Sequence, residues 1–252
     1  MPAELLDKRE ARIRRMFGQI APWYDFLNHL LSLNIDRRWR DKTAKLVAPV
    51  PGAGPVLDLC TGTGDLALTY DRAAQGTVPV VGADFCHEML VRAAQKAHAA
   101  GAGSRVRFVE ADAQALPFPA DTFQIVTVAF GLRNITDTDA GLAEMVRVAK
   151  PGGRIAILEF SKPRHWLLGR LYRWYFRYAL PLIGQILCRN RESAYRYLPE
   201  SVLKFPDYEE LAAKLRAHGL ADVAYRPLTF GVATLYVGVK PATRPTPSAD
   251  GA

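Results

Sequence analysis

An α/β fold, with a parallel β-sheet and helices on both of its faces, is the architecture that the sequence predicts. From Pro55 onward, short runs rich in β-forming residues alternate with helical patterns, which is typical of a parallel sheet wound by right-handed crossovers. The first of these runs ends in a glycine-rich turn that leads directly into a helical pattern. A chain of 252 residues, 49% of them hydrophobic, is long enough to bury the core of one such domain.

Five strands are expected before residue 161, and two later runs have the pattern of closing strands. Helices fall between the strands, for example Glu88–Ala99 and Ala140–Val148, and the run Pro151-Gly152-Gly153 is expected to stop the second helix. The expected strands are Val56–Leu59, Val78–Ala83, Val106–Glu110, Ile125–Ala129, Arg154–Glu159, Asp222–Arg226 and Val232–Val239.

Three further segments are expected in or around this domain of residues 51–240. Residues 1–50 contain a basic, helix-like stretch at 8–15 and an apolar, aromatic part through Trp39, which we interpret as an N-terminal helical cap. Residues from about 162 to 206, after the fifth strand, are expected to form a helical lid insertion. The tail 241–252 is polar and rich in proline, so we expect it to be disordered.

Charge and cysteine content narrow the classes of function. The formal charge of +8 suits nucleic acid, anionic lipid or an acidic ligand, but we recognise no single-strand stacking module or basic stripe, so no nucleic-acid partner is expected. Cys60, Cys86 and Cys188 include no close metal-ligand pair, which indicates buried small side chains and no metal site. Because we find neither a secretion signal nor an uncharged stretch long enough to span a membrane, we expect a cytoplasmic protein.

The sharpest local signal is the run from Val56 to Asp65, a strand that ends in a glycine-rich turn and opens a helix. Gly62 and Gly64 would let the backbone approach a ligand at the carboxyl edge of a Rossmann-like sheet. The run lacks the third glycine of the dinucleotide fingerprint, and Asp58 enters just before the turn. This pattern favours a cationic ligand with an amino-acid moiety, and an NAD-dependent dehydrogenase is the alternative.

Three carboxylates follow or end three consecutive strands. Asp58 belongs to the first, Asp84 ends the second, where it could accept both hydroxyls of a ribose, and Asp112 follows the third. Asp112 could accept from an adenine amino group while Ala113 supplies a backbone donor. Taken singly, these acids could instead cap helices or form a turn. Taken together, they predict a nucleoside site at one edge of the sheet.

Four segments carry a resemblance to a known family. They are Tyr24–Trp39, the glycine loop, Phe130–Asn134 and Arg147–Pro163. The chain resembles the ubiquinone/menaquinone biosynthesis C-methyltransferase family from Met16 to Lys240. The resemblance implies a class I fold that uses S-adenosylmethionine (SAM), and it implies that a reduced, prenyl-tailed quinone precursor is the methyl acceptor. A SAM-dependent methyltransferase of another small molecule is the alternative.

The resemblance also implies particular cofactor contacts. Thr63, Asp84, Asp112 and Ala113 are implied to contact SAM, and Ala129 would contact it through its backbone. The chain departs from the family at a few positions: Asp36 stands in place of a histidine, Ala149 in place of a larger aliphatic residue, Phe230 in place of a glycine and Tyr236 in place of a histidine. The Asp36 change weakens a catalytic role for that position, and none of the departures touches the three acids.

The chemistry of methyl transfer suggests where catalytic residues would lie. SAM already carries an activated methyl group, so the enzyme must align it with a nucleophilic carbon and exclude water. A hydroquinone supplies such a carbon once one hydroxyl is deprotonated. Arg133 and Asn134, after the fourth strand, are expected to stabilise and orient the developing phenolate, although Arg133 could be a partly exposed ion pair.

Three residues of the N-terminal segment are candidates for the proton acceptor. Tyr24, Asp25 and His29 could fold over the site, and a histidine titrates near the working pH. His29 could equally be a packing residue, in which case a bound water takes the proton.

The sequence does not decide what the predicted lid packs against. Residues 166–180 place apolar and aromatic side chains on one helical face, with three arginines off that stripe. Such a helix could pack on the core, on a second copy of the chain in a homodimer, or on an anionic membrane. The acceptor could be a demethylmenaquinol, which we favour, or a 2-methoxy-6-polyprenyl-1,4-benzoquinol.

Overall fold

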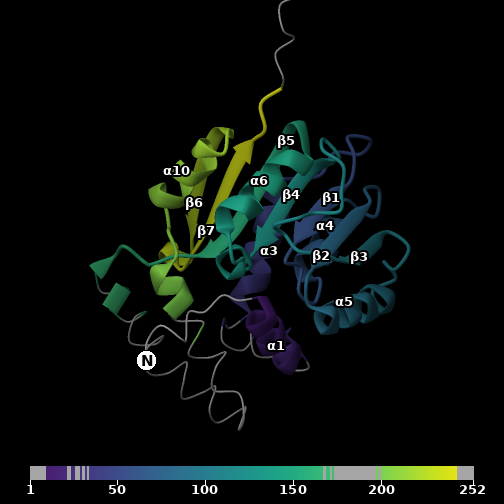
Figure 1. Cartoon of the computed structure of the whole chain (residues 1–252), viewed down its shortest axis with the longest axis horizontal. Helices are drawn as coiled ribbons and strands as arrows, with labels where there is room; N and C mark the ends of the chain where they lie inside the picture. Colours follow the sequence, from purple (N-terminus) through teal and green to yellow (C-terminus); the bar gives the residue numbers. More distant parts are fainter. Residues whose placement is uncertain are drawn as a thin grey trace, which may run out of the picture.

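The computed structural model describes residues 10–21, 24, 25, 29, 32, 34–166, 169, 170, 172, 197 and 200–242. Seven strands form one sheet (Figure 1): β1 (Val56–Leu59), β2 (Val80–Asp84), β3 (Val106–Glu110), β4 (Phe123–Ala129), β5 (Ala149–Phe160), β6 (Ala221–Leu228) and β7 (Ala233–Val239). The described helices are α1 (Glu10–Ile20), α3 (Ile35–Leu46), α4 (Asp65–Ala73), α5 (His87–Ala99), α6 (Thr138–Val148) and α10 (Glu209–Ala217), with the short turns η3 (Leu132–Asn134) and η5 (Thr229–Gly231).

The strand order β3-β2-β1-β4-β5-β7-β6 places a reversal between β1 and β4. Strands β1 to β5 pair in parallel, whereas β7 runs antiparallel between β5 and β6. From β1 the chain winds outward through β2 to β3 and then returns to β4 on the other side of β1. Connections that leave β1 and β4 therefore diverge, which opens a crevice at the carboxyl edge of the sheet. The predicted α/β fold is confirmed.

Strand and helix bounds follow the sequence patterns closely. β1 and β3 have the expected bounds, and the other five expected strands are each found with ends shifted by up to five residues. One expectation was wrong. Pro151-Gly152-Gly153 do not stop α6, which ends at Val148, because β5 begins at the next residue and runs through them. Gly152 adopts φ 75° there and donates its N–H to the Lys240 carbonyl at 2.8 Å, and the register with β4 shifts between Phe123 and Ile125.

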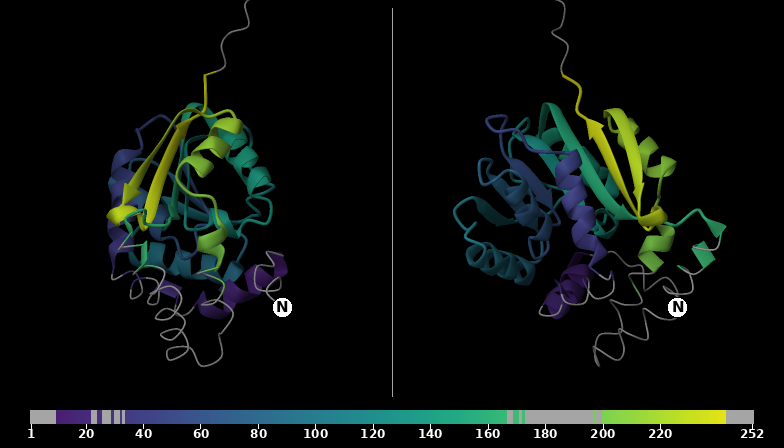
Figure 2. Two further views of the ribbon diagram at one scale, coloured as in Figure 1. Left: turned by 90° about the vertical axis from the view of Figure 1, so that its left-hand side faces the viewer. Right: turned by 180° about the vertical axis from the view of Figure 1, so that it is seen from behind.

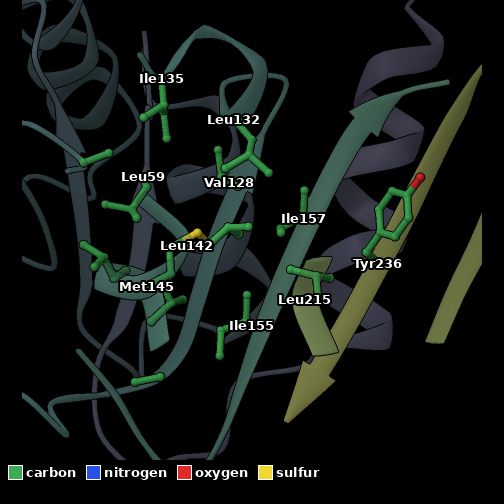
Figure 3. Close-up of a cluster of buried hydrophobic side chains, with 14 of the residues drawn as sticks. Leu59, Val128, Leu132, Ile135, Leu142, Met145, Ile155, Ile157, Leu215 and Tyr236 are labelled. Carbon is green, nitrogen blue, oxygen red and sulfur yellow. The ribbon is translucent and has the colours of Figure 1, made fainter. Parts of the chain in front are cut away.

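The core lies in two layers, one on each face of the sheet. Alternate residues of a strand point to opposite faces, so Leu57 packs in one layer and Val56 in the other. On the first face the strands pack against α6 and α10 through residues such as Leu142, Met145 and Leu215 (Figure 3). On the second face α3 and α4 cover the sheet, and α3 lies in front of it in the right view of Figure 2. Because both faces are covered, the central strands are almost continuously apolar.

The N-terminal helix α1 lies at the carboxyl edge of the sheet (Figure 1). Ile13 and Met16 of α1 pack with Cys86 and Met89 at the start of α5, and Tyr24 and Phe85 join this cluster. The cap is thus held to the domain through α5. Most of the proposed lid and its 166–180 helix, residues 243–252 of the tail, and Cys188 lie outside the described residues. None of the helices in the described ranges is both long and apolar enough to cross a membrane.

Candidate active site

A pocket opens at the carboxyl edge where β1, β2 and β4 end. It encloses about 740 Å³ with its mouth included, which is within the usual range for a small-molecule site. Among the residues that the sequence predicts for the site, seven line it: Tyr24, Gly62, Asp84, Asp112, Ala113, Ala129 and Asn134. The cysteine before the glycine loop, Cys60, lines it as well and is only half-buried.

The glycine loop takes up left-handed backbone conformations. Gly62 has φ 56° and Gly64 has φ 83°, values that favour glycine. Gly62 faces the pocket, and its N–H donates to Oδ2 of Asp84 at 2.8 Å. Gly64 instead precedes the first turn of α4, and a Cβ there would lie 3.0 Å from the Phe108 ring. We conclude that Gly64 permits close helix packing, whereas Gly62 forms the pocket wall.

Asp84 has the geometry expected of a ribose acceptor. Its carboxylate is 7% exposed, and each oxygen accepts one backbone N–H, from Cys86 at 2.9 Å and from Gly62 at 2.8 Å. Each oxygen keeps a further lone pair for a ligand in the pocket. Burial raises the pKa of Asp84 to about 6 against the opposing effect of these N–H donors. The alternative role, capping α5, is not what these contacts do, because Cys86 is the N-cap residue of α5 and Gly62 belongs to the glycine loop.

Asp58 stabilises the glycine loop through a hydrogen bond and does not contact the pocket. It is buried in β1 and accepts from the Thr61 hydroxyl at 2.6 Å, but it does not line the pocket. Burial raises its pKa to about 7. The expectation that Asp58 contacts the ligand is therefore wrong. Asp58 lies inside β1, which ends at Leu59, and the residues of this segment that follow the strand and line the pocket are Cys60 and Gly62.

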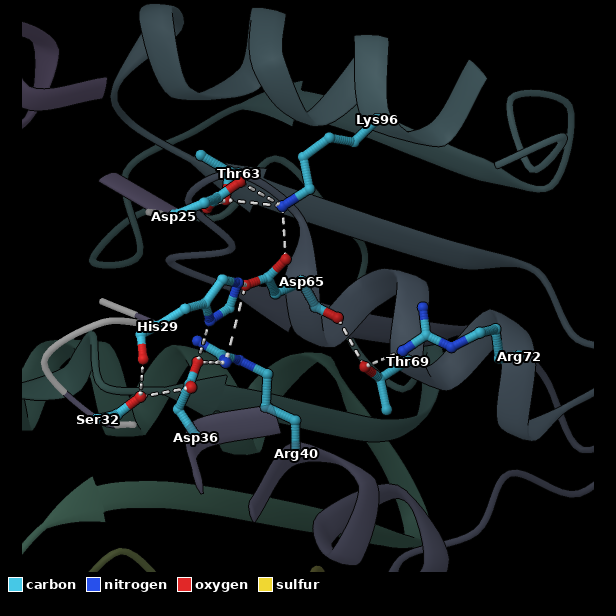
Figure 4. A network of polar contacts seen from close by, with 10 residues as sticks. All are labelled: Asp25, His29, Ser32, Asp36, Arg40, Thr63, Asp65, Thr69, Arg72 and Lys96. Atoms are coloured by element: carbon cyan, nitrogen blue, oxygen red, sulfur yellow. Dashed lines mark hydrogen bonds and ion pairs between the residues drawn. The ribbon is translucent and has the colours of Figure 1, made fainter. Parts of the chain in front are cut away.

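Thr63 and Asp25 are joined to one another and not to the pocket wall (Figure 4). The Thr63 hydroxyl donates to the Asp25 carboxylate, and Lys96 of α5 donates to Asp25 at 2.7 Å and to Asp65 at 2.5 Å. The Lys96 ammonium also lies 3.2 Å from the Thr63 hydroxyl. This cluster ties the N-terminal segment to the start of α4.

His29 lies in the second half of the same network. Its Nδ1 atom is 2.8 Å from Oδ2 of Asp36. The same oxygen accepts from Arg40, and Oδ1 of Asp36 accepts from the Ser32 hydroxyl. Although burial opposes ionisation, the Ser32 hydroxyl and the Arg40 charge hold the pKa of Asp36 below its usual value. His29, Asp36 and Asp65 have the spacing of metal ligands, but Arg40 already places its guanidinium between the two carboxylates. Asp25 and His29 are thus held in a structural network, away from the lining of the pocket.

Arg133 forms a buried ion pair, and not the partly exposed pair that the sequence left as an alternative. Its side chain is 5% exposed and donates to Glu159, itself 1% exposed, at 3.1 Å, and to the Phe130 carbonyl. Within the described part of the chain, the Arg133 Nε–H has no hydrogen-bond partner. Asn134, one residue later, lines the pocket.

An aromatic cluster is made of Trp39, Phe130 and Phe160, and of these three only Phe130 lines the pocket. The Phe130 and Phe160 rings are 4.4 Å apart, and Trp39 lies 5.9 Å from Phe130. Arg40 and Arg133 lie over the Phe130 and Phe160 rings. Phe130 lines the pocket from a left-handed backbone position, φ 59°. The sequence analysis quoted Phe130 within a motif but did not foresee this role, which depends on three segments far apart in the chain.

Another part of the pocket lining is apolar and was also not predicted. It is formed by Ile13 and Phe17 of α1, Phe85 after β2, and Met89 of α5. Phe85 directly follows Asp84, and this adjacency was an available signal for a ring-binding residue beside the ribose acceptor.

Comparison with known proteins identifies the family. Residues 5–240 match the ubiE/COQ5 methyltransferase family. The chain belongs to this family. It is similar to the ubiquinone/menaquinone biosynthesis C-methyltransferase UbiE of Geobacter sulfurreducens, with 48% identity over 93% of this chain and 91% of the relative. It is also similar to a demethylmenaquinone methyltransferase of Thermus thermophilus, with 50% identity over 90% of this chain and 100% of the relative.

Solved structures agree with the fold. A SAM-dependent methyltransferase of Thermotoga maritima has a TM-score of 0.65 at 15% identity and covers 90% of this chain and 99% of its own. Phosphoethanolamine N-methyltransferase 2 of Haemonchus contortus, in complex with S-adenosyl-L-methionine, has a TM-score of 0.59 at 16% identity and covers 81% of this chain and 52% of its own. Because the chain belongs to the ubiE/COQ5 methyltransferase family, the protein is a SAM-dependent methyltransferase, which confirms the resemblance and excludes the dehydrogenase alternative.

The residues present suit this cofactor. Asp84 keeps acceptor positions for two ribose hydroxyls, Asp112 and Ala113 line the pocket beyond it, and Gly62 presents backbone at the pocket wall. These groups accept and donate as an adenosyl group requires, and none of them is a cluster of cations that would select a diphosphate.

Proposed function

We propose that this protein transfers a methyl group from SAM to a ring carbon of a reduced, prenyl-tailed quinone precursor. The observation that carries the proposal is the 50% identity to a demethylmenaquinone methyltransferase over that relative's whole length. Phe130 supports it, because this ring lines the pocket together with Asn134 and a flat hydroquinone ring packs well against an aromatic face. Methyl transfer to another small molecule remains the competing proposal.

On the cofactor side, we assign Asp84 to the ribose hydroxyls and Asp112 with the Ala113 N–H to adenine. Gly62 and the backbone of Ala129 form the wall nearest the methionyl group. Bound SAM supplies a methyl group that is already electrophilic. Asp58, Thr63 and Gly64 then act by holding the loop in shape, since each contacts other residues of the chain and does not line the pocket.

On the acceptor side, Arg133 and Asn134 are proposed to stabilise the phenolate that makes the ring carbon nucleophilic. Arg133 is paired with the buried Glu159, and its guanidinium carbon lies 5.4 Å from the centroid of the Phe160 ring. Arg133 itself does not line the pocket and its Nε–H is fully buried, so it is proposed to act through the position of its guanidinium beside Asn134 in η3, without touching the substrate. Exclusion of water from the pocket strengthens this electrostatic effect.

For the proton, we propose a bound water as the acceptor. Asp25 already accepts from Thr63 and Lys96, and His29 is paired with Asp36, so neither side chain is placed to take a proton from a substrate in the pocket. Tyr24 does line the pocket and is proposed to orient this water.

The acceptor ring is tested by competition. Equal amounts of a reduced demethylmenaquinone and a reduced 2-methoxy-6-polyprenyl-1,4-benzoquinone are supplied with isotopically labelled SAM, and labelled products are separated by mass. We expect label in the naphthoquinol, alone or in excess. Label in neither ring, with transfer to an amine or hydroxyl acceptor, would overturn the proposal and leave the cofactor site standing.

We also propose peripheral attachment to the anionic cytoplasmic face of a membrane through the segment that begins at Trp166, whose side chain is 68% exposed. A prenyl-tailed substrate resides in the membrane, and Arg164 and Arg170 beside this tryptophan are exposed. Retention on anionic vesicles, with little on neutral vesicles or on RNA, is expected. A concentration-dependent dimer without vesicle binding would instead assign the segment to a homodimer contact.

A further inference from the structure

Gln114 holds the carboxylate of Asp112 in place. Its Nε2 atom lies 3.1 Å from both carboxylate oxygens of Asp112, and its backbone N–H donates to Oδ1 at 2.9 Å. At the other end of the side chain, Oε1 accepts the backbone N–H of Asp137 at 2.8 Å. Both Asp112 and Gln114 line the pocket and are half-buried.

Only an amide side chain satisfies both ends of this bridge. A carboxylate can only accept, so the group that faces Asp112 must donate, and a backbone N–H can only donate, so the group that faces Asp137 must accept. The orientation of the Gln114 amide is therefore fixed by its two partners. A glutamate at this position would keep the acceptor for Asp137 but would face Asp112 with a second negative charge.

The bridge connects two walls of the pocket. Asp137 is the N-cap of α6, and its own carboxylate accepts from the N–H groups of Asp139 and Ala140. Residues 134–136, immediately before it, line the acceptor side of the pocket. Through Gln114, the loop after β3 and the loop after β4 are thus joined by hydrogen bonds that are anchored on a helix N-terminus.

We propose that Gln114 is a positioning residue that sets the enzyme's selectivity for the adenine base. It fixes the Asp112 carboxylate so that a remaining lone pair of Oδ2 faces the pocket and accepts from the 6-amino group of adenine. This inference rests on the adenine contact assigned to Asp112 in the proposed function. A base with an oxygen in place of the amino group would meet that lone pair with its own and would be rejected.

The test compares two nucleosides by calorimetry. S-adenosylhomocysteine and S-inosylhomocysteine differ at the 6-position of the base, and the ratio of their dissociation constants measures selectivity. In Gln114→Met we expect the affinity for S-adenosylhomocysteine to fall on the order of tenfold, with a smaller fall for S-inosylhomocysteine, so that the ratio shrinks. Gln95→Met, at an exposed glutamine of α5, is the matched control and should change neither affinity.

A second pair of variants tests the mechanism by exchanging the two groups. Gln114→Glu should lose selectivity most strongly at low pH, where a proton shared by the two carboxyl groups lets Asp112 donate. The double variant Asp112→Asn with Gln114→Glu restores one amide beside one carboxylate and keeps the acceptor for Asp137. We expect it to regain most of the selectivity lost in Gln114→Glu. This comparison also stands if Gln114→Met fails to fold.

The outcomes separate this inference from the proposed function. If Asp112→Asn alone leaves both affinities unchanged, the adenine contact itself is wrong. If Asp112→Asn narrows the ratio while Gln114→Met weakens both nucleosides equally or not at all, Gln114 only supports the fold and the inference is overturned.

Discussion

The backbone N–H of Gly62 donates to Oδ2 of Asp84 across 2.8 Å, which joins the glycine loop to the end of β2. We predict that Asp84→Asn weakens SAM binding, because the amide replaces one acceptor oxygen with a donor. A lost hydrogen bond to a charged group costs about 1.5–3 kcal/mol, which corresponds to a ten- to hundredfold change in affinity. Calorimetric titration of the variant measures this loss, and unchanged affinity would remove Asp84 from the site.

The affinity of the unmodified protein for SAM should also depend on pH. Since the pKa of Asp84 is about 6, this affinity should fall as the pH drops through that value, and calorimetric titration at several pH values measures the fall.

Asp58 should make the stability of the ligand-free protein depend on pH. Its pKa is about 7 in the folded chain and about 4 when unfolded, so the folded state holds this proton more tightly. The stability that this group contributes is therefore fully present below about pH 4 and is lost as the pH rises through about 7.

Asp58→Asn removes this pH dependence. We expect the unfolding free energy of the variant, relative to the unmodified protein, to rise by on the order of 4 kcal/mol between about pH 4 and pH 8. Denaturant unfolding at several pH values measures the difference, and a difference that stays constant with pH would contradict the assignment.

The buried Arg133–Glu159 pair predicts two separable effects. Arg133→Gln leaves the Glu159 charge buried without its partner and should destabilise the fold by about 3–5 kcal/mol. The double variant Arg133→Gln with Glu159→Gln should recover most of that stability but not turnover, since the guanidinium beside Asn134 is lost. Thermal melting and turnover are measured on both, with SAM affinity expected to stay nearly unchanged. Recovery of turnover in the double variant would assign Arg133 a structural role alone.

Lys96 predicts a link between the N-terminal cap and the cofactor loop. Lys96→Met leaves Asp25 and Asp65 without the ammonium that joins them, so residues 10–21 should exchange amide hydrogens faster and SAM affinity should fall about three- to tenfold. Lys214→Met, which removes an exposed pair with Asp139, is the control and should leave both measurements unchanged. Faster exchange without any loss of affinity would separate the cap from the cofactor site.

The fold was predictable because its elements are local patterns. β1 and β3 could be bounded from their β-forming residues, and the carboxylates at 84 and 112 could be placed at one edge because parallel strands end there. The pairings that shape the site could not be predicted in the same way. Arg133 meets Glu159, Thr63 meets Asp25 and Gln114 meets Asp137 only after the chain folds, and nothing in the spacing of these residues selects one partner over another.

The catalytic roles predicted for Asp25 and His29 were wrong for the same reason, because the partners of these side chains come from distant parts of the chain. Asp25 and His29 are polar residues in a segment near the pocket, which made them reasonable candidates for catalysis. The structure supplies Lys96 and Arg40 from α5 and α3 as their neighbours, directly or through Asp36, and so holds them in an ion-pair network. A sequence pattern locates such side chains near a site but does not reveal which of them are already paired.

The most direct test of the central claim is the mass of the quinone product formed under two redox conditions. A prenylated demethylmenaquinone is supplied with SAM labelled in its methyl group, once reduced to the quinol and once kept oxidised, and the product is fragmented to locate the label. We predict a labelled methyl group on a ring carbon from the quinol and no product from the quinone. Equal labelling of the oxidised quinone, or label found on an oxygen, would contradict the account.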